Sequence, residues 1–427
     1  MILMSKTTIV KIQDIVLLGG GYVNVWAYRQ LEQKLRKQLR EGKVRITLVS
    51  SDTHHSFHGF TNEILSGSVR LEHPHSDLRK LCPKAAFVLG KALKLEPHNN
   101  TVEIQLEDGQ TTTLHYDQLL LGVGSHDRLE IVPGQRGHTF QVKDSKALQT
   151  LLTHLDHVLE QALTAPVEAR AALLSVVVVG AGFVGVETCT AIAERWGQMR
   201  QQHPILRQAR ASIHLLEAGS SILHEWQSDL PHLAEYAERQ VKAYGIDLRL
   251  NTKLECFTAE GVRLSTGFIS AATVISTIGQ APNTFPGTEG FSRASHGRIL
   301  TDQSLRILNT KNLWTGGDVA HVEQPGRLEA CPPNALWAIQ HGIHIGNNIS
   351  AVVLGRQPKP FTARAPIQAA SFGIGKAALE LYGLQLTGWL AWIVRLIGFL
   401  SYVPSRHQAY KVFQDVLGHS FKPSYKN

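Results

Sequence analysis

Two glycine-rich segments each stand between an apolar run and a stretch of helical character. The second is Gly180-Ala181-Gly182-Phe183-Val184-Gly185, after the valines 176–179, and the first is Gly19-Gly20-Gly21, after the apolar run 15–18. In such a turn the first glycine permits a tight reversal, the second lets the backbone approach a pyrophosphate, and the third lets helix and strand pack closely. The helix N-terminus adds free N–H groups and a partial positive charge. The two turns predict that one chain holds two adenine dinucleotides and passes electrons between them.

The residue that ends the strand following each glycine turn indicates which dinucleotide that site would bind. Glu217 follows the strand 213–216, and a carboxylate there binds an adenosine ribose and repels a 2′-phosphate, which favours NADH over NADPH. At the first site Ser50 occupies the acidic position, with Asp52 nearby as an alternative ribose ligand, and Asn24 stands where the third glycine is expected. We therefore expect the first site to be irregular.

Four cysteines, Cys82, Cys189, Cys256 and Cys331, lie far apart in the sequence. They form no Cys-x-x-Cys pair and no metal-ligand pattern, which suits a protein of a reducing compartment. The sequence therefore lacks the redox-active cysteine pair that a disulfide reductase requires. Residues 1–10 lack the long apolar core of a signal peptide. A histidine-rich loop at 54–58 has no acidic or cysteine partner nearby in sequence, so no metal site is predicted.

The composition sets the class and the partners of the chain. Its 427 residues exceed one ordinary domain, and 43% of them are hydrophobic, enough for full cores. Lys+Arg exceed Asp+Glu by 43 to 35, a formal charge of +8 that favours anionic partners, including anionic lipid. Because no basic cluster is interleaved with aromatic residues, nucleic acid is not an expected partner.

The order of apolar periods indicates an α/β chain with two Rossmann-like, doubly wound domains. A small antiparallel sheet is expected from 86–89, 101–106 and 112–114, and strand 119–121 ends in the segment 122–125. The expected nucleotide units are strand 15–18, helix 22–41 and strand 44–49, and, after a helix at 144–163, strand 176–179, helix 183–200, strand 213–217, helix 229–244, strand 246–250 and a hairpin near Gly261.

Residues 387–403 differ from the rest of the chain. They are apolar and carry aromatic residues typical of a lipid–water boundary, but they are too short to span a bilayer and include Arg395. From 387 onward five basic residues stand against Asp415 alone, so we expect an interfacial membrane anchor with a basic flank. The alternative is a helix packed on the protein's own core or on a second subunit. The five basic residues are Arg395, Arg406, Lys411, Lys422 and Lys426.

Four stretches together resemble the type II NADH dehydrogenases, single-chain NADH:quinone oxidoreductases that do not pump protons. The stretch 182–187 is similar to the nicotinamide-site signature and 315–320 to the late flavin motif. The stretch 332–342 resembles the helix that meets the flavin and the quinone, and 386–392 resembles the start of the membrane-binding helices. In the quinone helix the chain departs from the family, with Leu336 where a glutamine is usual.

The resemblance implies the domains and the residues of a site. FAD would bind residues 1–150 and 286–350, NADH would bind 151–285, and 351–427 would hold the anchoring helix. Glu187 and Gln340 would be catalytic. The implied FAD-site residues are Gly19, Gly20, Gly21, Ser50, Gly124, Asp318, Val319 and Ala320; the NADH-site residues are Gly180, Gly182, Gly185 and Glu217, with Gly279 at the return to the flavin domain.

The same resemblance implies a peripheral respiratory enzyme on the cytoplasmic face of a membrane, with a quinone and an anionic lipid surface as partners. Two alternatives stay open. Asn24, Ser50 and Leu336 would suit a non-catalytic NADH-binding redox sensor. A soluble NADH-dependent reductase of another acceptor would use 387–403 as a homodimer interface.

Overall fold

The computed structural model describes residues 11–209, 211–326, 329–363 and 367–420. The chain divides into two compact units. The first unit comprises residues 1–55, 76–126 and 281–365, and the second comprises 56–75, 127–280 and 366–427. Each unit contains one of the two glycine turns.

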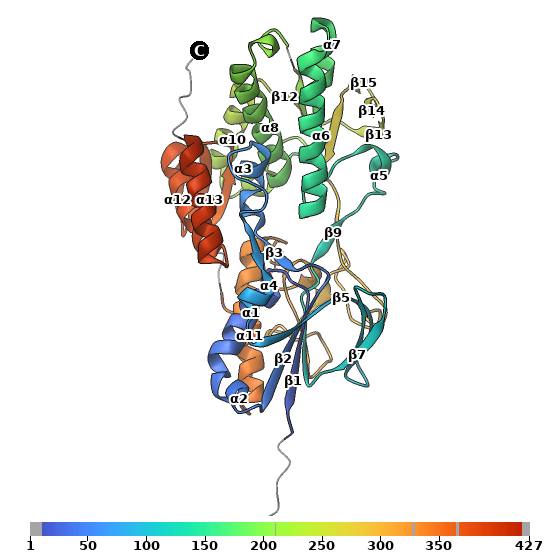
Figure 1. Ribbon diagram of the computed structural model, residues 1–427, viewed down its shortest axis with the longest axis vertical. Coiled ribbons are helices and arrows are strands. Elements are labelled where there is room, and N and C mark those ends of the chain that lie inside the picture. The colour runs from blue at the N-terminus through green and yellow to red at the C-terminus, as the bar shows by residue number, and fades with distance from the viewer. Residues whose placement is uncertain (1–10, 210, 327–328, 364–366, 421–427) are drawn as a thin grey trace, which may run out of the picture. The chain divides into compact units, whose positions relative to one another are not determined.

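A seven-stranded sheet of order β19-β8-β1-β2-β5-β6-β7 forms the centre of the first unit (Figure 1). Strands β19, β8, β1, β2 and the start of β5 are parallel, and β5, β6 and β7 continue as an antiparallel meander. The strands are β1 (Gln13–Leu18), β2 (Val44–Ser50), β5 (Ala85–Glu96), β6 (Thr101–Leu106), β7 (Thr111–His115), β8 (Gln118–Leu121) and β19 (Leu313–Thr315).

Strand β5 differs from the sequence prediction. Residues 86–89 pair in parallel with β2, whereas the antiparallel pairing with β6 begins at Gly90. A single strand of 12 residues is long enough to serve both parts of the sheet. The predicted helix 22–41 also divides, because Leu35 leaves the helical conformation between α1 (Tyr22–Lys34) and α2 (Arg36–Arg40).

Helices α1 and α11 (Ala335–Val353) lie side by side in the first unit, as Figure 1 shows. Two glycines one helical turn apart make this approach possible. A Cβ on Gly342 would lie 2.4 Å from the carbonyl oxygen of Val23, and one on Gly346 would lie 2.5 Å from that of Ala27. The close packing fixes α11 beside the first glycine turn.

The second unit has a parallel sheet of order β12-β11-β10-β16, whose register pairs β10 with both β11 and β16. The predicted order of strands and helices is confirmed here, with small shifts at the ends of the elements. The elements are α6 (Ser145–Thr164), α7 (Val167–Leu173), β10 (Val176–Val179), α8 (Phe183–Gln202), β11 (Ile213–Leu216), α10 (Pro231–Ala243), β12 (Asp247–Arg249), β13 (Leu254–Thr258), β14 (Gly261–Leu264), β15 (Gly267–Ser270) and β16 (Thr273–Ser276).

The C-terminal part of the second unit is a three-stranded meander followed by two helices, drawn in red in Figure 1. Its elements are β21 (Gln368–Ser371), β22 (Ala377–Leu381), β23 (Leu384–Thr387), α12 (Gly388–Tyr402) and α13 (Arg406–Ser420). Among the described residues, no helix is both long enough and apolar enough to cross a bilayer. Lys422 and Lys426 lie outside the described residues.

The remaining elements are short. They are β3 (His54–Ser56), α3 (Thr61–Leu65), β4 (His75–Asp77), α4 (Leu78–Leu81), β9 (Ser125–Asp127), α5 (Gln135–His138), α9 (His224–Gln227), β17 (Gln280–Pro282), β18 (Ile299–Leu300) and β20 (Ala320–His321).

Candidate nucleotide and redox site

The first glycine turn keeps its tight geometry although Asn24 replaces the third glycine. Gly19 has φ +112°, and a Cβ there would lie 2.4 Å from the carbonyl oxygen of Gly122. Asn24 is fully buried, and its Nδ2 donates hydrogen bonds to the carbonyl oxygens of Leu18 at 2.6 Å and Gly19 at 2.7 Å. The asparagine amide therefore holds the reversal between β1 and α1 closed from inside.

Ser50 lies directly beneath this turn, at the end of β2. It is buried, and its Oγ accepts a hydrogen bond from the backbone N–H of Asp52 at 3.1 Å. A Cβ on Gly20 would come within 2.6 Å of Ser50 Oγ, so only glycine leaves the backbone this close to the strand. Of the described residues beyond its chain neighbours, none comes within 4 Å of the Cβ position of Gly21, so the outer side of the turn is open.

Asp318 lies in the short 3-10 turn η3 (Gly317–Val319), where Ser125 Oγ donates a hydrogen bond of 2.6 Å to its Oδ2. Gly317, with φ +68°, donates its N–H to Nδ1 of His341 at 3.0 Å. Burial, with smaller contributions from His344 and Arg298, lowers the pKa of His341 to about 3. The ring is therefore neutral and anchors the turn as an acceptor, a role that sequence analysis missed.

Three other predicted flavin-site residues have no side chain available for a ligand, because the side chain is either buried or absent. Val319 packs in the apolar core of the first unit, and Ala320 is buried where β20 begins. Gly124 has φ +67° and accepts a hydrogen bond from the N–H of Asn283 at 3.0 Å. Any contact of these residues with a cofactor would therefore be made mainly by the main chain.

The second glycine turn has the tight strand-to-helix geometry that its glycine spacing predicts. Gly180 has φ +99°, and a Cβ on Gly185 would lie 1.8 Å from the carbonyl oxygen of Gly180. Thr277 Oγ1 donates hydrogen bonds to the carbonyl oxygens of Val179 at 2.9 Å and Gly180 at 3.2 Å. The Cβ position of Gly182, which caps α8, has no described neighbour within 4 Å apart from adjacent residues. This turn too is open outward.

Glu217 connects the end of β11 to the second turn. Its Oε2 accepts a hydrogen bond from the N–H of Ala181 at 2.7 Å, and its Oε1 accepts one from Gly219 at 2.8 Å. Gly279, by contrast, forms a close chain crossing: it has φ +82°, and a Cβ there would lie 2.0 Å from Ile131 Cδ1. The positive φ by itself favours glycine at this position, since the exposed Ile131 side chain could move aside.

Glu187 lies in the second turn of α8 and keeps 24% of its side chain exposed. Its Oε1 accepts a hydrogen bond from the N–H of Ser371 at 2.7 Å and lies 3.9 Å from Arg395 Nη2. Burial of the carboxyl group raises its pKa to about 7 and Glu63 acts in the same direction, while Arg395 and Ser371 oppose the shift. Glu187 is thus a carboxyl group that exchanges a proton near neutral pH.

Arg395 does not belong to a basic flank, and its inclusion there is wrong. The side chain is 2% exposed and lies inside the second unit against Glu63 and Glu187. A lone arginine in the middle of an apolar helix was the available signal, because arginine is almost never fully buried unless it is paired. Its partner Glu63 lies 332 residues away, which no local pattern indicates.

Helix α11 begins at Ala335 and is capped by Asn334, whose side chain accepts a hydrogen bond from the N–H of Trp337 at 3.0 Å. Leu336 and Gln340 both lie in the first turns of this helix, and both are partly exposed. The structure thus places the two residues on one partly accessible helix start, next to the η3 turn that the same helix contacts.

A family profile described as pyridine nucleotide-disulphide oxidoreductase matches residues 13–342, most of the chain and both glycine turns. The chain belongs to this family. Pyridine nucleotide-disulphide oxidoreductases that are similar over most of their length include the type II NADH:quinone oxidoreductase of Staphylococcus epidermidis, 22% identical over 88% of this chain and 91% of the relative. Another is a probable NADH dehydrogenase of Dictyostelium discoideum, 23% identical over 93% and 87%.

Solved structures share the fold. NDH2 from Plasmodium falciparum, solved in complex with NADH, superposes with a TM-score of 0.84 at 15% identity, covering 97% of this chain and all of that one. The sulfide:quinone oxidoreductase of Aquifex aeolicus gives a TM-score of 0.71 at 16% identity, covering 97% and 93%. The predicted α/β architecture with two nucleotide-binding units and a helical C-terminal segment is confirmed.

Two cysteines of this pyridine nucleotide-disulphide oxidoreductase, Cys189 and Cys331, are poorly suited to thiol chemistry. Cys331 is buried, and burial raises its pKa to about 12; the same cause raises the pKa of Cys189. A thiol with a raised pKa holds little of the reactive thiolate at neutral pH. These cysteines therefore resemble buried apolar side chains.

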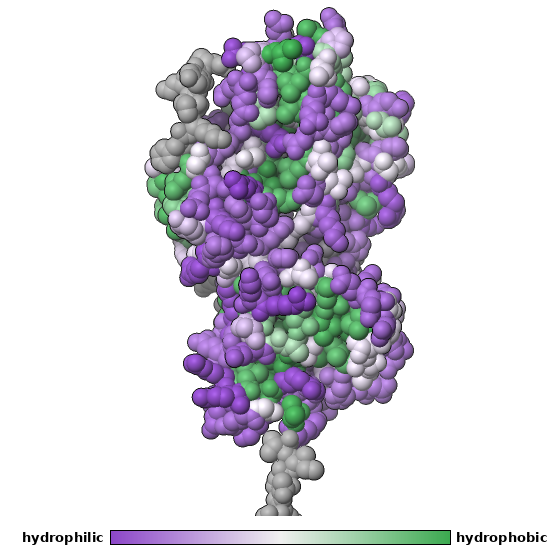
Figure 2. Space-filling view, in the orientation of Figure 1, coloured by the Kyte–Doolittle hydropathy of each residue, from purple (hydrophilic) through white to green (hydrophobic). Residues whose placement is uncertain are grey.

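Exposed apolar residues lie on one side of the two C-terminal helices and on the neighbouring hairpin. Green residues gather at the left edge of Figure 2, where Figure 1 places α12 and α13. We call this set the C-terminal apolar surface. It consists of the exposed residues Tyr382, Leu384, Trp389, Leu390, Ile397, Tyr410, Phe413 and Leu417.

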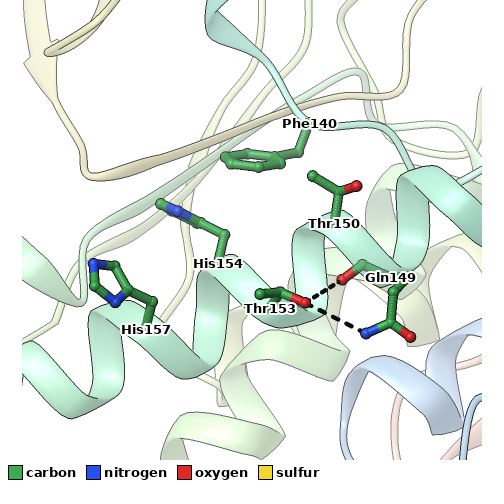
Figure 3. Close-up of a pocket in the computed structure, with 6 residues that line it drawn as sticks. All are labelled: Phe140, Gln149, Thr150, Thr153, His154 and His157. Carbon is green, nitrogen blue, oxygen red and sulfur yellow. Dashed lines mark hydrogen bonds between the residues drawn. The ribbon is translucent and has the colours of Figure 1, made fainter.

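A hollow of about 440 Å³ opens on α6 and includes none of the predicted site residues in its walls (Figure 3). His154 stacks on Phe140 with ring centroids 4.4 Å apart, and its Nε2 lies 2.9 Å from the hydroxyl of the buried Thr273. Burial lowers the pKa of His154. These contacts fasten α6 to the sheet, which is a structural role.

Proposed function

We propose that this protein is a peripheral membrane enzyme that oxidises NADH by means of bound FAD and reduces a membrane quinone, without pumping protons. The observation that carries the proposal is the pair of glycine turns, one in each unit, each closed against its own strand and open on its outer side. A chain with two such turns is equipped to hold two dinucleotides at once.

The residues of the first unit fit FAD. At Gly21 the space that a side chain would fill is open, and the N-terminus of α1 directs its backbone N–H groups and a partial positive charge towards a pyrophosphate placed there. Asp318, held by Ser125, would accept hydrogen bonds from hydroxyl groups of the flavin's sugar chain. Bound FAD would supply hydride acceptance from NADH and two-electron delivery to the quinone.

The residues of the second unit fit NADH. Gly182 leaves the pyrophosphate position open at the N-terminus of α8. Glu217 follows the neighbouring strand, and the two backbone hydrogen bonds to its carboxylate hold it in place. Each of its oxygens retains a lone pair for a ribose hydroxyl, and its negative charge opposes a 2′-phosphate. We therefore propose NADH rather than NADPH as the reductant.

The overall reaction consumes a proton, because NADH + H⁺ + quinone gives NAD⁺ + quinol. Glu187 is suited to hold that proton, since its pKa of about 7 leaves the carboxyl group substantially protonated at neutral pH and its side chain is partly accessible. Gln340, at the start of α11, would donate a hydrogen bond from its amide to a quinone oxygen. We propose both as residues that contact the reactants.

The C-terminal apolar surface supports attachment to a membrane. Trp389 is 66% exposed and Ile397 is 64% exposed, on a helix that is too short to span a bilayer but long enough to lie in its interface. Arg406 and Lys411 of α13 add positive charge beside it. We propose binding to anionic lipid on the cytoplasmic face, where a quinone can enter from the bilayer.

An anaerobic visible spectrum, recorded before and after adding NADH, tests the redox assignment. Flavin absorbance that bleaches with NADH and returns with a quinone is the expected result. No flavin absorbance after reconstitution with FAD would refute the proposal and favour an NADH-binding sensor. Bleaching that only a soluble acceptor reverses would favour a reductase of another substrate.

Flotation with liposomes tests the membrane assignment. Vesicles of phosphatidylcholine with anionic phosphatidylglycerol should carry the protein upward, and neutral vesicles should carry less. If the protein stays in the dense fraction and sediments as a dimer, the C-terminal apolar surface is a subunit interface instead.

A further inference from the structure

A buried acidic residue, Glu63, lies close to the partly exposed Glu187 and outside both glycine turns and all four motif stretches. Glu63 belongs to the short helix α3 and is 6% exposed. Its Oε1 accepts a hydrogen bond of 2.6 Å from Arg395 Nη1 and a weaker one of 3.4 Å from Ser371 Oγ. Its Oε2 has no hydrogen-bond partner among the described residues. The charge of Glu63 is thus compensated through one oxygen, by one arginine.

Arg395 is shared unequally between the two carboxylates. It lies 2.6 Å from Glu63 and 3.9 Å from Glu187, and its Nη2 also donates to the carbonyl oxygen of Gly59 at 2.8 Å. Phe399 covers the guanidinium, with the carbon of that group 4.6 Å from the ring centroid. The arginine is therefore held in the geometry that favours Glu63.

The groups that face Glu187 come from α3, α12 and β21. Glu63 of α3 and Arg395 of α12 face it directly, while β21 contributes only the N–H of Ser371. On α8 itself, Glu194 accepts a hydrogen bond from Ile374 N and lies near Lys376, and Arg195 pairs with Asp156 of α6. With both Glu63 and Glu187 ionised, one buried guanidinium would face two negative charges.

We propose that Glu63 keeps Glu187 protonated by taking Arg395 as its own counterion. A buried cation that is hydrogen-bonded to one carboxylate and lies farther from a second compensates the second one less well, which favours its protonated form. Glu63 is then a positioning residue, which acts on Glu187 through Arg395 and touches no reactant. Its role in the reaction rests on the proposed function, because it makes Glu187 a proton donor to the reduced quinone.

Replacing Glu63 by glutamine tests this directly. The amide keeps the shape of the side chain but removes its charge, so Arg395 becomes the counterion of Glu187. Infrared difference spectra of the full-length protein, titrated with acid, report the carboxyl C=O band, and the band that Glu187→Gln removes belongs to Glu187. In E63Q its midpoint should fall by roughly one unit or more, because the like charge of Glu63, which raises the pKa of Glu187, is removed while Arg395 stays 3.9 Å from Glu187.

Glu194→Gln is the matched control. Glu194 is also a partly buried residue of α8, and burial raises the pKa of its carboxyl group to about 7, but it bonds the backbone N–H of Ile374 rather than Arg395. The midpoint of Glu187 should stay within about 0.3 units of wild type in E194Q, much less than the shift from a nearby opposite charge. An unchanged midpoint in E63Q, or an equal shift in both variants, would overturn the proposal.

A second variant decides the question if E63Q does not fold. Glu63→Leu removes the same charge with an apolar side chain of similar volume and should likewise lower the midpoint of Glu187, and an unchanged midpoint would refute the proposal. The infrared titration needs neither NADH nor quinone, so its failure is separable from failure of the proposed activity. If the enzyme is active, the pH at which quinone reduction declines should move to lower values in E63Q together with the infrared midpoint.

Discussion

Replacing Asn24 by alanine removes the two short hydrogen bonds that close the first glycine turn and a third, long one of 3.5 Å to the carbonyl oxygen of Gly122. The carbonyl oxygen of Leu18 keeps a second donor, the N–H of Gly122 at 3.0 Å. Losing the Asn24 amide therefore costs this carbonyl no more than one ordinary hydrogen bond. Gly19 O loses the amide donor at 2.7 Å within the interior of the turn. One ordinary bond and one poorly satisfied carbonyl together cost about 2–4 kcal/mol of the free energy of unfolding of the first unit.

Hydrogen–deuterium exchange measured on peptides covering residues 13–35 is the suitable assay, because it reports the first unit separately from the second. For amides that exchange only when the whole unit opens, a loss of about 2–4 kcal/mol in the free energy of unfolding makes exchange about 30- to 900-fold faster. The FAD content of the purified variant, read from its visible absorbance, should fall in parallel. The measurement should be made on apo-protein first, since bound FAD would mask the loss by stabilising the folded state.

Asn99→Ala is the control within the same unit, because the Asn99 amide is exposed and bonds only Glu96 at 3.1 Å in the contacts described. It should leave exchange at 13–35 unchanged. Asn24→Asp, which keeps the volume but replaces the amide donor by a buried carboxylate, should be at least as damaging as N24A. Wild-type exchange and FAD content in both N24A and N24D would show that the glycines alone close the turn.

Three further changes have outcomes that the structure determines. Gly185→Ala would place a methyl group 1.8 Å from the carbonyl oxygen of Gly180, so NADH binding measured by calorimetry should be lost while FAD absorbance remains. Because burial raises the pKa of Glu187 from 4.5 to about 7, the folded protein binds more protons than the unfolded chain between these values. Its stability should therefore decline as pH rises from about 4.5 to 7, and in E187Q, followed by thermal unfolding, this part of the decline should disappear. Trp389→Ser combined with Ile397→Ser should reduce liposome flotation without changing NADH-dependent bleaching, whereas unchanged flotation would place the lipid contact elsewhere.

The turns could be predicted from the sequence because their requirements are local. A positive φ or a missing Cβ selects glycine within a few residues, so the spacing at 180–185 indicates the turn directly. Asn24 could not be understood in this way, since the turn that it closes also packs against Gly122, which lies 98 residues along the chain. From the glycine spacing alone we expected an irregular first site. The Asn24 amide instead keeps the turn tight.

The pairing of Glu63 with Arg395 could not be predicted either, because it too depends on residues far apart in the sequence. Their ion pair joins residues 332 positions apart, and neither residue belongs to a motif. Charge counting treated Arg395 as solvated, because a composition-based argument cannot tell the two faces of a helix apart. A helical projection would have separated them: Arg395 and Ile397 are about 200° apart around α12.

That separation gives α12 an unusual distribution of polarity. Its buried face carries its single charge, Arg395, whereas the exposed positions Trp389, Leu390 and Ile397 are apolar. A helix on a water-exposed surface ordinarily has the reverse arrangement, with charge outside and apolar residues inside. The internal ion pair with Glu63 fixes which side of α12 faces inward, because turning the helix would leave two buried charges uncompensated. The apolar side is then presented outward in a fixed orientation, which is what an interfacial membrane contact requires.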